Sequence, residues 1–220
     1  MGAKMTRKEE LRKILKSALR EKFAQTPPEE IRRLSLDALS HLLQLSVLRK
    51  AVTIMLYLEM PREFPASPFM LPLLNQSERR IVIPWCEENH LRLFRLVSAV
   101  EVKNPDDLDS LCSDRLASGA YGILEPKEEL RFRPEFRIEP NQVDVIILPG
   151  LGFDRRCRRL GRGKGYYDRF IANLRSDVPL IGVCFDEQVV ERIPTEPHDR
   201  PIDYVLTPTR LYTAEPGANG

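Results

Sequence analysis

Two runs of apolar residues, at 143–148 and 178–185, constrain the fold of this chain more than any other feature. Only Asp144 places a charge within either run. Strands with apolar residues on both sides must be covered on both faces, which is typical of parallel sheets flanked by helices. Both runs are far shorter than the roughly 20 residues that a membrane-spanning helix needs. They therefore predict buried strands of an α/β protein.

The remaining segments extend this pattern into a β-α-β rhythm. Further strands are expected at 51–58, 80–84, 91–97 and 203–206, and helices at 167–174 and 187–192. We therefore predict a three-layer α/β fold with a mostly parallel sheet and helices on both faces. Residues 1–212 are expected to form one domain, and residues 213–220 a frayed tail.

Two helices are expected before the first strand. Thr6 and Glu9 have the spacing of a capping box, and Pro28 marks the start of the second helix. Apolar residues at helical spacing in the first helix predict a buried stripe of Leu11, Ile14, Leu15, Ala18, Leu19 and Phe23. The inward residues of the second helix are expected to be Ile31, Leu34, Ala38, Leu42 and Leu45.

Composition and charge restrict the class of protein. The chain has 220 residues, 42% of them apolar, and a net charge of +2. This small sum conceals basic segments at 1–22 and 153–169 and an acidic segment at 177–206. They suggest a polyanion site with a cation site beside it, although charge runs taken alone are better explained as solvated faces. The four cysteines lack zinc-type spacing, and the charged N-terminus does not resemble a secretory signal. A cytoplasmic protein with no membrane role is expected.

The segment that follows the strand at 143–148 has the chemistry of an anion site. It reads PGLGFD at 149–154 and, after four further residues, RLGRGKGYYD at 159–168. Alternate glycines permit positive φ angles and let consecutive amides turn toward an anion. Arg162 and Lys164 lie between those glycines and can add charge. Because ligands of open α/β sheets bind beyond the carboxyl ends of strands, this loop is well placed.

Two common nucleotide motifs do not account for this loop. A P-loop requires Gly at 158 and Ser or Thr at 165, where Arg and Gly stand. The dinucleotide motif requires Gly at 166, which is Tyr. The residues alone thus predict a phosphate-binding loop of another type, with a flexible basic turn as the alternative.

Taken together, these residues closely resemble the signature of the 5-formyltetrahydrofolate cyclo-ligase family, also called 5,10-methenyltetrahydrofolate synthetases. The resemblance extends to KEELR at 8–12, GILEP at 122–126, and Cys184-Phe185, Gln188, Ile193-Pro194 and His198-Asp199. It thus covers nearly the full chain.

The resemblance implies an ATP- and Mg²⁺-dependent ligase that converts 5-formyltetrahydrofolate to 5,10-methenyltetrahydrofolate, ADP and phosphate. In this reaction ATP phosphorylates the formyl oxygen, N10 of the folate closes the ring, and phosphate departs. The protein would position the reactants and neutralise charge rather than supply a nucleophile.

The resemblance also implies roles for particular residues. Arg162 and Lys164 would be catalytic, by stabilising the transferred phosphoryl group. Asp168 and Asp199 would bind magnesium, because carboxylate oxygens suit this ion. The folate would contact Leu58, Glu63 and Tyr166. The ATP-binding residues would be Lys8, Arg12, Arg159, Leu160, Gly161, Arg162, Gly163, Lys164, Gly165, Tyr166 and Tyr167.

One segment departs from the family pattern. The family usually has an acidic stretch around the position of Glu63, whereas this chain reads EMPREFP at 59–65. Pro61 and Phe64 break the pattern, and this difference bears on which residues of this segment contact the folate.

Other functions remain to be compared with the ligase. The patch at 155–169 could serve a nucleotide- or nucleic-acid-binding module, although the near-neutral charge and few interleaved aromatics argue against nucleic acid. A sugar-phosphate isomerase or an acyl transferase could share such a fold. The expected partner is a reduced folate, not nucleic acid or membrane, and the chain is expected to be a monomer or small homo-oligomer.

Overall fold

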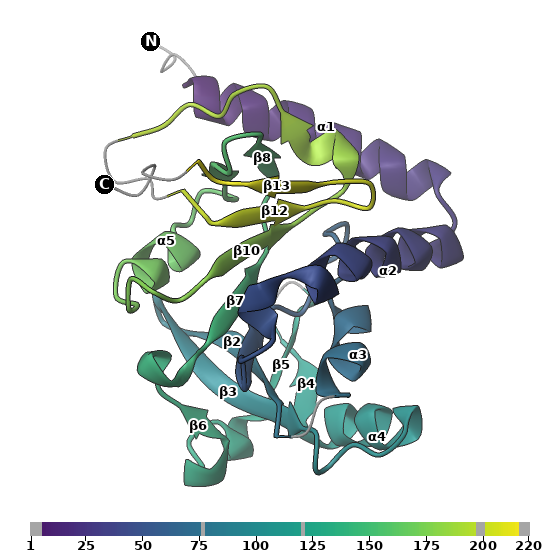
Figure 1. Ribbon diagram of the computed structural model, residues 1–220, viewed down its shortest axis with the longest axis vertical. Coiled ribbons are helices and arrows are strands. Elements are labelled where there is room, and N and C mark those ends of the chain that lie inside the picture. Colours follow the sequence, from purple (N-terminus) through teal and green to yellow (C-terminus); the bar gives the residue numbers. More distant parts are fainter. Residues whose placement is uncertain (1–5, 76–77, 120–121, 197–200, 216–220) are drawn as a thin grey trace.

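The computed structural model describes residues 6–75, 78–119, 122–196 and 201–215. An eight-stranded sheet in the order β13-β12-β10-β7-β1-β2-β3-β6 forms the centre of this part of the chain (Figure 1). Its strands are β1 (Thr53–Leu56), β2 (Arg80–Glu87), β3 (His90–Ser98), β6 (Arg137–Ile138), β7 (Val145–Leu148), β10 (Leu180–Val183), β12 (Tyr204–Leu206) and β13 (Leu211–Thr213).

Two smaller sheets and several helices surround this centre. The small sheets contain β8 (Gly152–Asp154), β9 (Arg159–Leu160) and β11 (Val189–Val190), and the pair β4 (Leu116–Ser118) and β5 (Leu124–Pro126). The α-helices are α1 (Arg7–Gln25), α2 (Pro28–Gln44), α3 (Met70–Leu74), α4 (Pro105–Arg115) and α5 (Tyr166–Ile171). Short 3₁₀ helices are η1 (Ser46–Leu48), η2 (Ser67–Phe69), η4 (Glu128–Leu130), η5 (Pro134–Phe136), η6 (Pro140–Gln142) and η7 (Asp186–Gln188).

The prediction of a mostly parallel sheet is confirmed. Strands β12, β10, β7, β1 and β2 pair in parallel through the middle of the sheet. Antiparallel pairs occur only toward its two edges, where β13 pairs with β12 and β3 lies between β2 and β6. The carboxyl ends of the parallel strands therefore lie at one end of the sheet.

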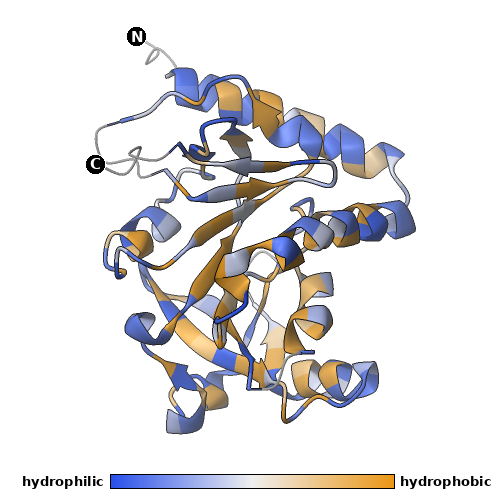
Figure 2. Cartoon of the chain, in the orientation of Figure 1, coloured by the Kyte–Doolittle hydropathy of each residue, from blue (hydrophilic) through white to orange (hydrophobic). Residues whose placement is uncertain are grey.

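Helices cover both faces of the sheet, as predicted. All four residues of β7 are buried, and alternate side chains enter different cores. Val145 and Ile147 pack with residues of α1, α2 and α3, whereas Ile146 and Leu148 pack with residues of α5. The central strands are accordingly hydrophobic along their length, while α1 and α2 alternate between polar and apolar segments (Figure 2).

The two N-terminal helices form where expected, with one difference on α1. Thr6 and Glu9 make the capping box, and Pro28 begins α2. The predicted stripe of α1 is too wide, because Ile14 is 64% exposed and Ala18 is also exposed. Only the row from Leu11 through Leu15 and Leu19 to Phe23, spaced four residues apart, contacts the core.

The helix predicted at 187–192 is wrong. The chain instead forms η7 and then β11, whose Val189 and Val190 pair in parallel with β8. The buried side chain of Gln188 accepts a hydrogen bond from the amide of Phe185 and donates to the carbonyls of Gly150 and Leu151. These contacts hold the turn against the segment between β7 and β8. The two valines that follow pair with β8, and β-branched residues favour a strand over a helix.

The end of the predicted domain and the membrane prediction can also be compared with the structure. Thr213, the first residue of the expected tail, is the last residue of β13 and pairs with Tyr204. Within the described residues, no helix has the length and apolar character needed to cross a membrane.

Candidate functional site

The glycine-rich loop lies between a short hairpin and α5. After β7 the chain forms β8, turns, returns as β9 and enters the loop at Gly161. Asp154 organises the turn: its buried carboxylate accepts hydrogen bonds from the amides of Arg156, Arg158 and Ile193, each 3.0 Å long. An aspartate before a basic turn is a recognisable sequence signal for this role, which is not among the predicted ones.

Glycine is required at two positions of the loop. Gly163 has a φ angle of +105° and Gly165 one of +68°, which L side chains rarely adopt. Gly165 is also the residue that precedes α5. The loop therefore has the backbone freedom that its alternating glycines predict.

Helix α1 contacts this loop directly. The Nε atom of Arg12 donates a 3.0 Å hydrogen bond to the carbonyl oxygen of Gly161. The helix can approach because Gly152 in β8 has no side chain: a Cβ there would lie 2.5 Å from Cδ1 of Leu15. Lys8, one turn before Arg12, has a mostly buried side chain whose Nζ lies 3.3 Å from Glu196.

The segment after β1 approaches the loop from another side. Nε of Arg162 lies 3.2 Å from Oε1 of Glu63, whose other carboxylate oxygen accepts from the amide of Met60 at 3.0 Å. The side chain of Glu63 is only 7% exposed. Burial raises the pKa of Glu63, although the charge of Arg162 and the bond from Met60 oppose this rise. Leu58, the other predicted folate contact on this segment, is half-buried against the core.

The departure from the family pattern has a structural role. Phe64 is buried, and its ring packs against Phe185 at 4.8 Å between centroids. Its carbonyl accepts a 2.6 Å hydrogen bond from the hydroxyl of the buried Tyr57. Pro61 is exposed beside Gly122. Phe64 thus anchors the segment in the core, and the carboxylate of Glu63 contacts Arg162 of the loop.

The start of α5 contributes an ion pair and a stacked ring. Arg159 pairs with Asp168, donates to the carbonyl of Pro149 at 3.2 Å, and lies over the ring of Tyr167. The carboxylate of Asp168 is 53% exposed. Burial and the nearby charge of Glu63 raise the pKa of Tyr167. Asp199, the other predicted magnesium ligand, lies outside the described residues.

Arg169 braces the loop, a role that sequence reasoning missed. It donates to the carbonyls of Lys164 and Asn89, each at 3.1 Å, and its guanidinium lies over the ring of Tyr166. The loop is thereby joined to the turn between β2 and β3. On β2, partial burial of the thiol and the charge of Glu125 raise the pKa of Cys86, and the charge of Lys164 opposes this rise.

The structure therefore brings together most of the predicted site. Arg12, Arg162 and Glu63 meet at the glycine-rich loop, and Arg159, Asp168 and Tyr167 meet at the start of α5. Among the described residues, no group of three or more His, Cys, Asp or Glu side chains forms a potential metal site. The arrangement can neutralise a polyanion and accept N–H groups at Glu63.

Comparisons with known sequences and solved structures relate this chain to one family of proteins. A sequence model described as the 5-formyltetrahydrofolate cyclo-ligase family matches residues 4–208. A probable 5-formyltetrahydrofolate cyclo-ligase of Schizosaccharomyces pombe is 24% identical over 217 residues, covering 93% of this chain and 97% of the relative. The 5-formyltetrahydrofolate cyclo-ligase of Mus musculus is 27% identical and covers 87% of this chain and 91% of its own length.

A solved structure shares the fold. The NMR structure of 5,10-methenyltetrahydrofolate synthetase from Aquifex aeolicus superposes with a TM-score of 0.73 and 32% identity, covering 96% of this chain and 95% of that one. Because the family model and this relative both span nearly the whole chain, the chain belongs to the 5-formyltetrahydrofolate cyclo-ligase family of enzymes.

Proposed function

We propose that this enzyme uses ATP and Mg²⁺ to convert 5-formyltetrahydrofolate to 5,10-methenyltetrahydrofolate, ADP and phosphate. One observation carries the proposal beyond family membership. The glycine-rich loop contacts Arg12 of α1 through Gly161, and Glu63 of the segment after β1 through Arg162. A basic side and an acidic side therefore flank one loop, and this supports a site in which a phosphoryl group passes between two substrates.

The proposed chemistry takes place entirely on the substrates. The formyl oxygen attacks the γ-phosphorus of ATP, and the bond to ADP breaks. N10 then attacks the formyl carbon and loses its proton, while the carbon–oxygen bond breaks and phosphate leaves. Phosphorylation is needed because the formamide oxygen is otherwise a poor leaving group.

The protein contributes position and charge to these steps. Arg162 and Lys164 would face the transferred phosphoryl group, where preorganised cations stabilise developing negative charge. Glu63 would accept N–H groups of the pterin ring, Leu58 would provide an apolar contact, and Tyr166 would lie where the two substrates meet. Lys8, Arg12, Arg159 and the backbone of residues 160–167 would hold the ATP.

Magnesium would be held by Asp168 together with Asp199. The exposed carboxylate at Asp168 suits this ion, which usually takes one or two carboxylates and completes its shell with phosphate oxygens and water. When bound, the ion would neutralise part of the charge on the phosphates. Arg159 would then share the Asp168 carboxylate or turn toward the phosphates.

A direct assay tests the proposal. Formation of the methenyl product is followed by its absorbance and release of ADP by a coupled assay, while ATP, Mg²⁺ and 5-formyltetrahydrofolate are omitted in turn. We expect product only with all three, and ADP release that depends on the folate. Folate-independent ADP release, or product formed without ATP, would refute the proposal.

The cytoplasmic location of the protein and its state as a monomer or small homo-oligomer stay predictions.

A further inference from the structure

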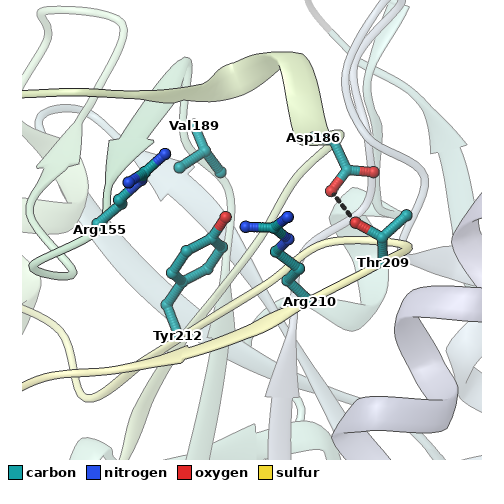
Figure 3. Close-up of a pocket in the computed structure, with 6 residues that line it drawn as sticks. All are labelled: Arg155, Asp186, Val189, Thr209, Arg210 and Tyr212. Carbon is teal, nitrogen blue, oxygen red and sulfur yellow. Dashed lines mark hydrogen bonds between the residues drawn. The ribbon is translucent and has the colours of Figure 1, made fainter.

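An open surface cavity of about 420 Å³ is lined by residues outside the glycine-rich loop (Figure 3). It is bounded by the β8–β9 turn, the segment after β10, and the β12–β13 hairpin. The residues that line it are Arg155, Asp186, Val189, Thr209, Arg210 and Tyr212. None of them belongs to the proposed ATP, folate or magnesium sites.

Two arginines give this cavity its character. Arg155 and Arg210 reach into it from different hairpins, with the hydroxyl of Tyr212 between their guanidinium groups in Figure 3. In the portion of the chain that the structure describes, neither guanidinium has a hydrogen-bond or ion-pair partner. The carboxylate of Asp186 accepts a 2.7 Å hydrogen bond from the hydroxyl of Thr209.

Both arginines are exposed to solvent, and an anion between them would interact favourably with both of their charges. A guanidinium presents a planar set of donors that matches the oxygens of phosphate and carboxylate groups. The hydroxyl of Tyr212 adds another donor, and its ring together with Val189 supplies an apolar wall. The volume lies within the range of small-molecule sites and exceeds the need of a single anionic group.

We propose that this cavity binds a small molecule through a multiply charged oxyanion, of either phosphate or carboxylate chemistry. The oxyanion lies between Arg155 and Arg210, and the body of the ligand lies against Tyr212 and Val189. Such a ligand joins the β8–β9 turn to the β12–β13 hairpin. Binding therefore raises the thermal stability of the protein without competing for the ATP site.

The experiment measures binding by calorimetry and by the shift in melting temperature, at low salt. Pyrophosphate represents a phosphate ligand and triglutamate a carboxylate ligand. Both are tested on the Lys164→Ala enzyme, in which the glycine-rich loop is weakened, with and without the further changes Arg155→Ala and Arg210→Ala. Arg156→Ala is the matched control, because this neighbouring exposed arginine does not line the cavity.

We expect at least one probe to bind the Lys164→Ala enzyme and to lose about tenfold or more in affinity when the two cavity arginines are removed, since each makes charge-assisted bonds. Arg156→Ala should leave that affinity unchanged. The probe that binds more tightly identifies the phosphate or carboxylate source. Binding of neither probe, or equal losses in the Arg156→Ala control, would overturn the proposal. Unchanged turnover in the Arg155→Ala/Arg210→Ala enzyme confirms that this variant is folded.

Discussion

Arg162 and Glu63 form an ion pair across the glycine-rich loop although 99 positions separate them in the sequence. Glu63 is almost fully buried, whereas Arg162 is about one-third exposed, with side-chain exposures of 7% and 35%. In the proposed reaction each has another partner: phosphate for Arg162 and pterin N–H groups for Glu63. In that reaction, substrate binding would exchange a contact within the protein for contacts with two ligands.

Replacing Arg162 should change the pH dependence of folate use. The positive charge lowers the pKa of Glu63, so Arg162→Ala raises this pKa further and the carboxylate forms only at higher pH. The acid limb of kcat/KM for the folate should therefore move to higher pH, whatever the loss in absolute rate. Arg162→Lys keeps the charge and should leave the limb close to that of the natural enzyme. An equal displacement in both variants would contradict the role of this ion pair.

Lys164→Ala should reduce turnover without unfolding the protein. The exposed side chain at 164 contributes little to packing, whereas loss of one preorganised cation at a transferred phosphoryl group costs roughly 100- to 1,000-fold in kcat. Steady-state kinetics and thermal unfolding should be compared with Lys103→Ala, which alters an exposed lysine before α4. A kcat within a few-fold of normal would rule out contact with the phosphoryl group.

Local patterns in the sequence were sufficient for the central strands and the loop. A strand with both faces buried leaves a continuous apolar run, as at residues 143–148, and positive φ angles require glycines at 163 and 165. Each of these features depends on residues that are close together in the sequence, so tertiary packing did not alter the predicted structure there. The helix predicted at 187–192 failed because Gln188 bonds to carbonyls 37 and 38 positions away.

The spacing of residues in the sequence does not by itself predict the contacts within the site. The family resemblance placed Arg162 and Glu63 in one site, but only the packing of β1 beside β7 brings their loops together. Arg169 was not assigned because its acceptors are backbone carbonyls, which every residue possesses. Ile14 was misassigned because a helical stripe predicted from spacing has no fixed width.

Asp168→Asn should raise the Mg²⁺ concentration needed for half-maximal activity. The amide keeps an oxygen acceptor for Arg159 but loses the charge that attracts the ion. A magnesium titration at saturating ATP and folate tests this, with Asp177→Asn as an exposed aspartate control outside the site. The same half-maximal concentration in all three proteins would remove Asp168 from the metal site.

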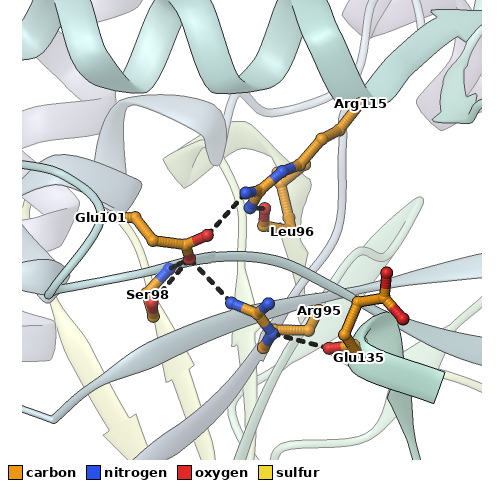
Figure 4. Close-up of polar contacts among 6 residues, drawn as sticks. All are labelled: Arg95, Leu96, Ser98, Glu101, Arg115 and Glu135. Atoms are coloured by element: carbon orange, nitrogen blue, oxygen red, sulfur yellow. Dashed lines mark hydrogen bonds and ion pairs between the residues drawn. The ribbon is translucent and has the colours of Figure 1, made fainter. Parts of the chain in front are cut away.

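Glu101 should contribute to acid stability. Burial alone would raise its pKa, but hydrogen bonds from Arg115 and Ser98 and the charge of Arg95 lower it from 4.5 to about 2 (Figure 4). Because the folded-state pKa is depressed, its stabilisation is complete above 4.5 and is lost as the pH falls toward about 2. The stability gap between the natural protein and Glu101→Gln should therefore narrow over this window.

Urea unfolding across that pH range provides the measurement. Glu135→Gln is a suitable control, since this carboxylate is about half exposed and lies 4.0 Å from Arg133. A gap of constant size at every pH would show that Glu101 acts through packing rather than through its charge.

Gly182→Ala should destabilise the sheet beneath the loop. A Cβ at 182 would lie 2.4 Å from the ring of Phe153 and 2.7 Å from Cδ1 of Ile202, and a Cβ at Gly150 would lie 2.4 Å from the same ring. The ring of Phe153 is fully buried between these glycines and cannot move aside freely. Overpacking of this kind costs about 1–3 kcal/mol in the free energy of unfolding.

Adding Phe153→Leu should recover part of this loss, because the smaller side chain leaves room for the Cβ at position 182. Urea unfolding of the four proteins in this double-mutant cycle measures the coupling, and strictly additive losses would mean that the two residues do not compete for that space.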